Sequence, residues 1–224
     1  MENKKGWYTQ NPTDSASKRE GLNSKYGNYD YGKDARIYYR AELKEVIRRC
    51  LNKRPLKKAL IAGVNSGEET YYLPNVGEVC GVDLAQGALR KAGKRGIVPI
   101  LADLEQLPFI DNYFDTCLAL RALYSKHTNL RVSLEELCRV LKEGGTVVLS
   151  VPNGYVIDGQ IKNGMYDYEN LCINASLPQK YKKETIELLK QINFIDIKTH
   201  ELPGEIVIFA RKPKNDLLDS EHRI

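Results

Sequence analysis

Short apolar runs alternate with helix-forming stretches from residue 58 onward, and this alternation restricts the fold more than any other feature of the chain. Strands that are separated by helices form a mostly parallel sheet with helices on both of its faces. The last two strands are instead joined by the turn-like sequence LPGE, so we expect an antiparallel pair at one edge. The predicted strands are 58–63, 78–83, 97–101, 114–120, 145–151, 193–200 and 205–211, and the predicted helices are 66–72, 86–95, 131–142 and 181–192.

The residues before the first strand divide into two parts. Residues 1–34 are rich in Asn, Gly, Ser, Tyr and Lys and have little periodicity, but they also contain Trp7 and several tyrosines. Disordered tails are usually poor in aromatic residues, so we expect part of this arm to pack on the rest of the protein. Residues 35–224 are the predicted α/β domain, which opens with a helix at 35–52 and carries a long aromatic connection at 152–180.

Three positions follow the first three strands, where a parallel sheet binds its ligands. The first strand ends in a loop with Gly63, Asn65 and Gly67, which tolerate left-handed backbone geometry and let a backbone approach a ligand closely, so we expect Asn65 to adopt a left-handed φ. Asp83 ends the second strand, where a carboxylate can accept hydrogen bonds from a ribose diol. Asp103 follows the third strand and can accept from an exocyclic amine such as that of adenine.

These positions together predict a site for an adenosine that carries no pyrophosphate. The spacing Gly-x-Gly-x-x-Gly, which is typical of dinucleotide sites, does not occur in the loop. Two structural alternatives remain open at this point. Asp83 is also placed to cap the helix that follows it, and Asp103 is also placed to cap a short turn before Leu104.

The segments ALIAGVNSGEET, VCGVDLAQGALRKA, LPFIDNYFD and RVLKEGGTVVLSVPN occur here in an order that resembles the class I S-adenosylmethionine-dependent methyltransferases. The resemblance is to the broad small-molecule and quinone-biosynthesis type, also called methyltransferase type 11, and it is strongest over residues 58–153. It implies a Rossmann-like, seven-stranded, mostly parallel sheet with an antiparallel edge strand. It also implies S-adenosylmethionine as cofactor and S-adenosylhomocysteine as product.

The resemblance also assigns roles to individual residues. The loop after the first strand would line the methionine end of the cofactor, Asp83 would hold its ribose, and the positions after the third strand would meet its adenine. The implied cofactor-binding residues are Gly63, Asn65, Gly67, Asp83, Leu84, Asp103 and Leu104, and the candidate catalytic residues are Arg121, Tyr124 and His127. The chain departs from the family in two places: Ile61 stands where an acid is usual, and Asn65 stands at the middle glycine.

Methyl transfer from a sulfonium is an in-line displacement, which needs alignment and exclusion of water more than acid–base chemistry. The sequence ALRALY after the fourth strand has no Asn/Asp-Pro-Pro-aromatic motif, which argues against methylation of exocyclic amines on nucleic-acid bases. No Pro-Cys or Thr-Cys pair follows strand four or five, which argues against a covalent cysteine mechanism at C5 of a pyrimidine. No pair of acids ends the fourth strand to hold magnesium. We therefore expect metal-independent transfer to an O or N atom of a small molecule, with 1–34 as a lid and 152–180 as a substrate loop.

The charge distribution keeps other classes of function open. Residues 1–60 hold 15 Lys or Arg against 7 Asp or Glu, which suits RNA or protein as the substrate, although an exposed helix face also explains it. The two departures favour a third class, a non-catalytic relative that serves as a partner protein. Five scattered cysteines and a polar N-terminus predict a cytoplasmic protein with no metal site and no membrane span.

Overall fold

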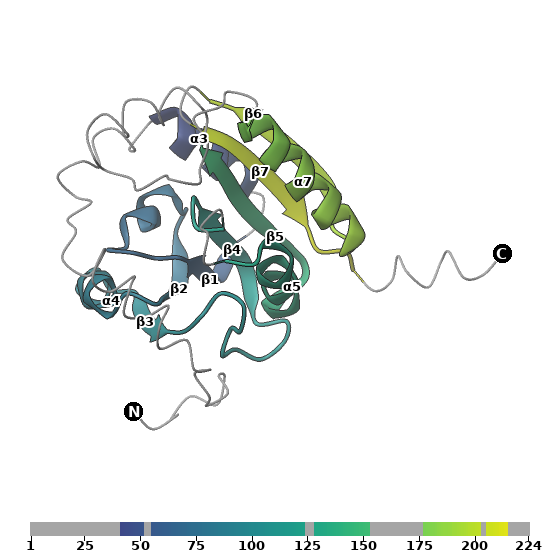
Figure 1. Ribbon diagram of the computed structural model, residues 1–224. Helices are drawn as coiled ribbons and strands as arrows, with labels where there is room; N and C mark the ends of the chain where they lie inside the picture. Colours follow the sequence, from purple (N-terminus) through teal and green to yellow (C-terminus); the bar gives the residue numbers. More distant parts are fainter. Residues whose placement is uncertain (1–40, 52–54, 124–127, 153–176, 203–204, 215–224) are drawn as a thin grey trace.

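The computed structural model describes residues 41–51, 55–123, 128–152, 177–202 and 205–214. Within these ranges seven strands form one sheet in the order β3-β2-β1-β4-β5-β7-β6 (Figure 1). The strands are β1 (Leu56–Ala62), β2 (Val76–Asp83), β3 (Val98–Leu101), β4 (Phe114–Leu120), β5 (Leu141–Pro152), β6 (Ile195–Glu201) and β7 (Glu205–Arg211). None of the helices in these ranges is long and apolar enough to cross a membrane.

The sheet is mostly parallel, as predicted. Strand β1 pairs in parallel with β2 and β4, β2 pairs in parallel with β3, and β4 pairs in parallel with β5. Strand β7 runs antiparallel between β5 and β6, so it lies second from the edge. The order of the strands reverses between β1 and β4, and ligands of such sheets bind beside this reversal at the carboxyl ends of the strands.

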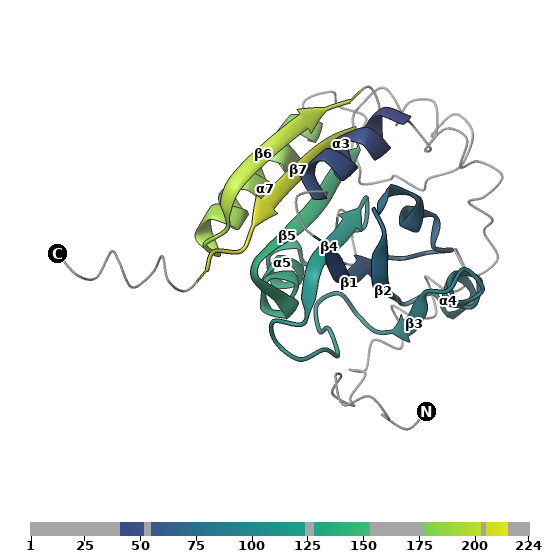
Figure 2. The same cartoon turned by 180° about the vertical axis from the view of Figure 1, so that it is seen from behind.

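Helices cover both faces of the sheet because side chains alternate in direction along each strand (Figures 1 and 2). Leu60 and Ala62 of β1 point into the core beneath α5 (Leu130–Val140) and α7 (Leu177–Gln191). Their neighbours Ala59 and Ile61 point into the core beneath α3 (Ala41–Leu51) and α4 (Gln86–Gly93). All four of these β1 residues are at most 1% exposed, so β1 is the buried centre on which the loop after it rests.

Several predicted helix boundaries differ from the structure, and two of these differences have a clear physical reason. The helix expected at 66–72 is a short 3₁₀ turn, η2 (Glu68–Tyr72), which starts only after Gly67 because Gly67 has a φ of 89°. The helix expected to reach 142 ends at Val140, and β5 begins at once with Leu141. Leu141 is pulled into the sheet by its pairing with Phe114 of β4, a contact that helical periodicity does not report.

Several sequence predictions concern residues outside the described ranges. The arm at 1–34 lies wholly outside them, and so do residues 153–176 of the predicted substrate loop. The first helix is described from Ala41 onward. Helix α7 begins at Leu177, four residues before its predicted start at 181.

Candidate functional site

The loop after β1 turns sharply at the carboxyl ends of the parallel strands, called the carboxyl edge below. Gly63, Asn65 and Gly67 have φ values of 72°, 47° and 89°, all in the left-handed region. The amides of Gly63 and Val64 both donate to the carbonyl of Val82, at 2.9 Å each, which fixes the loop on the end of β2. The prediction that Asn65 adopts left-handed geometry in place of a glycine is therefore confirmed, and it follows from the tolerance of Asn for this region.

Both loop glycines are also held by close packing. A Cβ atom on Gly63 would lie 2.6 Å from Cβ of Ala122, and one on Gly67 would lie 2.5 Å from Cδ1 of Ile97. The Cβ atom of Ala122 cannot move without its backbone, so Gly63 is needed for its space as well as for its φ, whereas Gly67 is needed above all for its φ of 89°. The loop is thus clamped between the segment after β4 and the segment that precedes β3.

Asp83 ties this loop to the end of β2. Its Oδ2 atom accepts from the Asn65 amide at 2.8 Å, and its Oδ1 atom accepts from the Ala85 amide at 2.9 Å. Burial raises the pKa of this carboxyl above its usual value, against the lowering by hydrogen bonds from neighbouring backbone amides. The alternative that Asp83 caps the next helix is wrong, because Ala85 occupies the N-cap of α4 without a side-chain cap bond.

The backbone amides of Asn65, Leu84 and Ala85 do not fill all of the about four acceptor sites of an ionised carboxylate, so Asp83 can accept from a further donor. The structure therefore brings Asp83 and the loop together, as the sequence predicted. Its role toward a ribose stays a prediction. The predicted contact of the half-buried Leu84 beside it with the cofactor also stays a prediction.

Asp103 lies in a tight turn after β3. Its Oδ1 atom accepts from the Glu105 amide, and its carbonyl accepts from the Gln106 amide, each at 3.1 Å. These bonds are those of the turn-capping alternative. The Ala102 amide donates to the carbonyl of Asp83 at 3.3 Å, so this turn and the end of β2 are neighbours at the same edge. The adenine roles of Asp103 and of the half-buried Leu104 remain predictions.

Arg121 follows β4 at the same edge. It has a φ of 57°, and its amide donates to Oγ of Ser150 at 3.0 Å. Its guanidinium forms an ion pair with Glu205 at the start of β7, in which the two side chains are 18% and 9% exposed. The structure thus places Arg121 at the carboxyl ends of β4, β5 and the start of β7. The other two candidate catalytic residues, Tyr124 and His127, lie outside the described residues.

Glu69 is a candidate site residue that was not predicted from the sequence. It lies on η2, and its Oε2 atom is buried with no hydrogen-bond partner among the residues that the structure describes. Burial raises its pKa from 4.5 to about 7, and the nearby charges of Glu68 and Asp83 add to this effect, whereas Arg121 opposes it. A buried oxygen without a donor is costly, so its presence at this edge marks Glu69 as a candidate to accept a hydrogen bond from a ligand.

The sequence held one signal for Glu69, the acid pair that follows the loop in SGEET. Glu68 is engaged already, since it accepts from the Ser66 hydroxyl and forms an ion pair with Arg95. Asn65 carries a second buried oxygen, Oδ1, that has no partner within the described ranges. Residues 65–69 therefore present two buried oxygen atoms that accept no hydrogen bond from the described residues.

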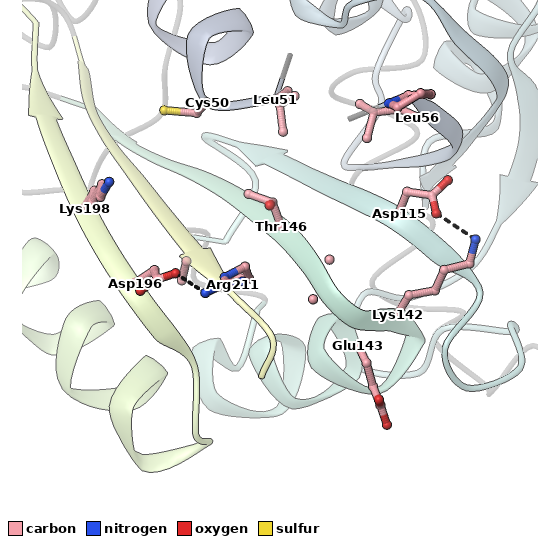
Figure 3. A pocket seen from close by; sticks show the side chains of 14 residues that line it. Cys50, Leu51, Leu56, Asp115, Lys142, Glu143, Thr146, Asp196, Lys198 and Arg211 are labelled. Atoms are coloured by element: carbon pink, nitrogen blue, oxygen red, sulfur yellow. Dashed lines mark hydrogen bonds and ion pairs between the residues drawn. The ribbon is translucent and has the colours of Figure 1, made fainter. Parts of the chain in front are cut away.

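A pocket of about 390 Å³ lies at the opposite edge of the sheet, near the amino ends of β1, β4 and β5 (Figure 3). Its charged residues largely satisfy one another: Lys142 pairs with Asp115 at 2.7 Å, and Arg211 pairs with Asp196. Asp115 also accepts from the amides of Lys57 and Lys58 at 2.8 Å each, so it acts as a structural anchor for β1. This pocket is separate from the edge at which the loop, Asp83 and Glu69 meet.

Comparison with known proteins finds one family and many relatives. Residues 60–149 match the family described as "Methyltransferase domain". An uncharacterized protein of Methanocaldococcus jannaschii is 30% identical over 162 residues, which are 72% of this chain and 74% of that protein. The ubiquinone/menaquinone biosynthesis C-methyltransferase UbiE of Burkholderia multivorans is 34% identical over 157 residues, or 64% of each protein. The chain spans about half the length, 45%, of the demethylmenaquinone methyltransferase of Corynebacterium glutamicum that it also matches.

Solved structures repeat the fold at low sequence identity. The N-methyltransferase NodS from Bradyrhizobium japonicum, in complex with S-adenosylhomocysteine, superimposes with a TM-score of 0.62 at 15% identity. The superposition covers 88% of this chain and 98% of NodS. A similarity at this level of identity concerns the fold, and the site described above is built from this chain's own residues.

Proposed function

Because this chain belongs to the class I S-adenosylmethionine-dependent methyltransferases, we propose that it methylates a small-molecule acceptor without a metal ion. Membership of the family brings S-adenosylmethionine as the cofactor and methyl transfer as the activity. The nature of the acceptor, the role of each site residue and the absence of a metal are the parts that we propose.

One observation carries the cofactor assignment. The Asp83 carboxylate joins the end of β2 to the left-handed loop through the Asn65 amide, at the edge where the strand order reverses. S-adenosylmethionine brings two ribose hydroxyls and an α-ammonium group. The unused lone pairs of Asp83 and the orphaned oxygens of Asn65 and Glu69 are acceptors for donors of these kinds, so the residues present fit the cofactor.

The proposed mechanism uses the chain's own groups to bind and align. When bound, the cofactor supplies a methyl group on a positively charged sulfur, which is an electrophile without further activation. Asp83 holds the ribose, the loop at 63–67 holds the methionine end, and Asp103 with Leu104 borders the adenine. Alignment of this kind turns a bimolecular encounter into an in-line displacement within one complex, which lowers the entropic part of the barrier.

Arg121 is the described residue that we place on the acceptor side. Its ion pair with Glu205 fixes the guanidinium at the carboxyl edge, beyond β4 and β5. A cation held there favours an acceptor that is anionic when it reacts, such as a phenolate or an enolate. With such an acceptor the chain needs no strong general base, because the proton leaves before or outside the displacement.

A carbon atom is the second candidate for the accepting atom, beside the O or N atom that the sequence predicted. The observation in its favour is the similarity to UbiE, whose name describes a C-methyltransferase of ubiquinone and menaquinone biosynthesis. The enolate form of a hydroquinone can react at carbon or at oxygen. Arg121 would stabilise the same anion in either case, so the product distinguishes the two candidates.

The experiment measures cofactor binding first and transfer second. Calorimetry with S-adenosylhomocysteine should detect binding by the full chain, and labelled S-adenosylmethionine should then transfer its methyl group to members of an acceptor panel. The panel contains phenols, amines, a demethylated naphthohydroquinone, bulk RNA and a protein extract. Failure to bind at a millimolar concentration, equivalent to about −4 kcal/mol, would contradict the proposal and favour a non-catalytic partner protein. Labelling of RNA or protein alone would contradict the small-molecule acceptor.

A further inference from the structure

The carboxyl group of Glu69 has an unusual position for an acidic side chain. It follows the loop at 63–67 by two residues, and its Oε2 atom is buried with no hydrogen-bond partner in the described parts of the chain. At the same edge, Asp83 already accepts two backbone amides and Glu68 is paired with Arg95. Glu69 is therefore an acid at this edge that directly follows the loop and keeps one buried oxygen without a donor in the described residues.

Strand β1 offers no alternative acid. Ile61 and Ala62 precede the loop, and both are buried in the apolar cores, 0% and 1% exposed. A cation that approaches the loop thus meets no carboxylate on the strand beneath it. Asp83 reaches the loop from β2 but already accepts the Asn65 amide, so the acids that directly follow the loop are the nearest in sequence that can receive the cation.

We propose that Glu69 accepts the α-ammonium group of the cofactor and that this contact makes cofactor binding depend on pH. The proposal rests on the proposed function, since it assumes that the chain binds S-adenosylmethionine. It adds the identity of the anion, which lies outside the positions that the family resemblance assigned. It also adds a regulatory property, because Glu69 must lose its proton before it can receive the ammonium as an ion.

Burial is the largest cause of the raised pKa of Glu69, and the charged groups around the side chain modify it. Arg121 comes from the end of β4, Asp83 from the end of β2 and Glu68 from the same turn. Helix α3 packs against η2 and carries two further cations. The Nζ atom of Lys44 lies 3.6 Å from the centre of the Tyr71 ring, and Arg48 donates to the carbonyl of Leu73. The balance leaves the Glu69 pKa at about 7, so the free protein at neutral pH holds this proton about half of the time.

Binding and proton release are therefore linked. Below pH 7 a growing share of the free protein has a neutral Glu69, and the affinity for a ligand with an ammonium group falls. Between pH 8 and pH 6 the ionised share drops about tenfold for a group of this pKa, so the affinity should also drop about tenfold. A ligand without the ammonium group should not sense this titration.

The test compares two ligands and three proteins by calorimetry. S-adenosylhomocysteine carries the ammonium group, and 5′-methylthioadenosine keeps the adenosine and the sulfur but lacks the amino-acid end. Glu69→Gln keeps the shape of the side chain and removes its charge, and Glu184→Gln on the exposed surface of α7 is the matched control. Titrations at pH 6 and pH 8, in two buffers of different ionisation enthalpy, also count the protons released on binding.

We expect Glu69→Gln to weaken S-adenosylhomocysteine binding about 10- to 100-fold at pH 8, as for a lost charge-assisted hydrogen bond. Methylthioadenosine binding should stay within about twofold, and the pH dependence and the proton release should disappear in this variant. Equal losses for both ligands would overturn the proposal, because Glu69 would then support the fold of the site. Unchanged binding of S-adenosylhomocysteine would overturn it while leaving the proposed function intact. Binding of neither ligand by the unaltered protein would overturn both.

Discussion

Replacement of Glu69 by glutamine should stabilise the unliganded protein, and only above the pH at which the buried carboxyl ionises. The pKa of Glu69 is raised from 4.5 to about 7, with burial as the largest cause. Since the folded state holds this proton more tightly than the unfolded chain, the free energy of unfolding falls as the pH rises from 4.5 to 7. The destabilisation is absent below this range and complete above it.

The magnitude follows from the two pKa values. Each pKa unit corresponds to about 1.4 kcal/mol, so the ionised side chain costs up to about 3 kcal/mol at pH 8 and less than about 1 kcal/mol at pH 5. Glutamine cannot ionise and is free of this cost. For a chain of this size the difference at pH 8 corresponds to a rise in melting temperature of about 6–12 °C.

Urea unfolding followed by far-ultraviolet circular dichroism at pH 5 and pH 8 measures the effect. The contribution of Asp115, whose pKa also changes on folding, cancels because it is common to both proteins. Glu184→Gln, at an exposed position of α7, serves as the control and should match the unaltered protein at both pH values. If Glu69→Gln raises the free energy of unfolding equally at the two pH values, or more at pH 5, the argument from burial is refuted.

Three other predictions concern the cofactor edge. Asp83→Ala should weaken S-adenosylhomocysteine binding by about 1–3 kcal/mol, as calorimetry on the folded variant would measure, and unchanged affinity would contradict the ribose assignment. Asn65→Gly should keep the fold and the binding, whereas Asn65→Val should lose about 1–3 kcal/mol of unfolding free energy, because a β-branched residue is strained at a φ of 47°. Equal melting curves for the two variants would contradict the argument from backbone strain. Removal of residues 1–34 should leave a folded domain with weaker binding and slower turnover, and normal turnover after this truncation would show that the arm is no lid.

Much of the fold could be predicted because the strands carry a strong local signal. Apolar runs such as Ala59 to Ala62 are buried on both faces of a parallel sheet, so they read as continuous hydrophobic segments in the sequence. The left-handed loop was also predictable, since Asn65 stands between two glycines and only a few residue types accept this geometry. These features depend on residues that are close together in the chain.

The unpredicted features depend on contacts between distant residues. The end of α5 at Val140 is set by the pairing of Leu141 with Phe114, and the position of Arg121 is set by Glu205, 84 residues away. The burial of Glu69 is of the same kind, because its neighbours Arg121 and Asp83 come from two other strands. The sequence SGEET does not distinguish its two acids, and only the packing of η2 separates the paired Glu68 from Glu69.

The position of β7 has a consequence for how the chain reaches its native state. This strand is synthesised after the other six, yet it lies inside the sheet between β5 and β6. Until residues 205–211 have left the ribosome, β6 has no neighbouring strand and the side of β5 that faces β7 is an open edge. Such an edge is a template for pairing with another chain, so the interval before β7 is complete is when the nascent protein is most exposed to aggregation.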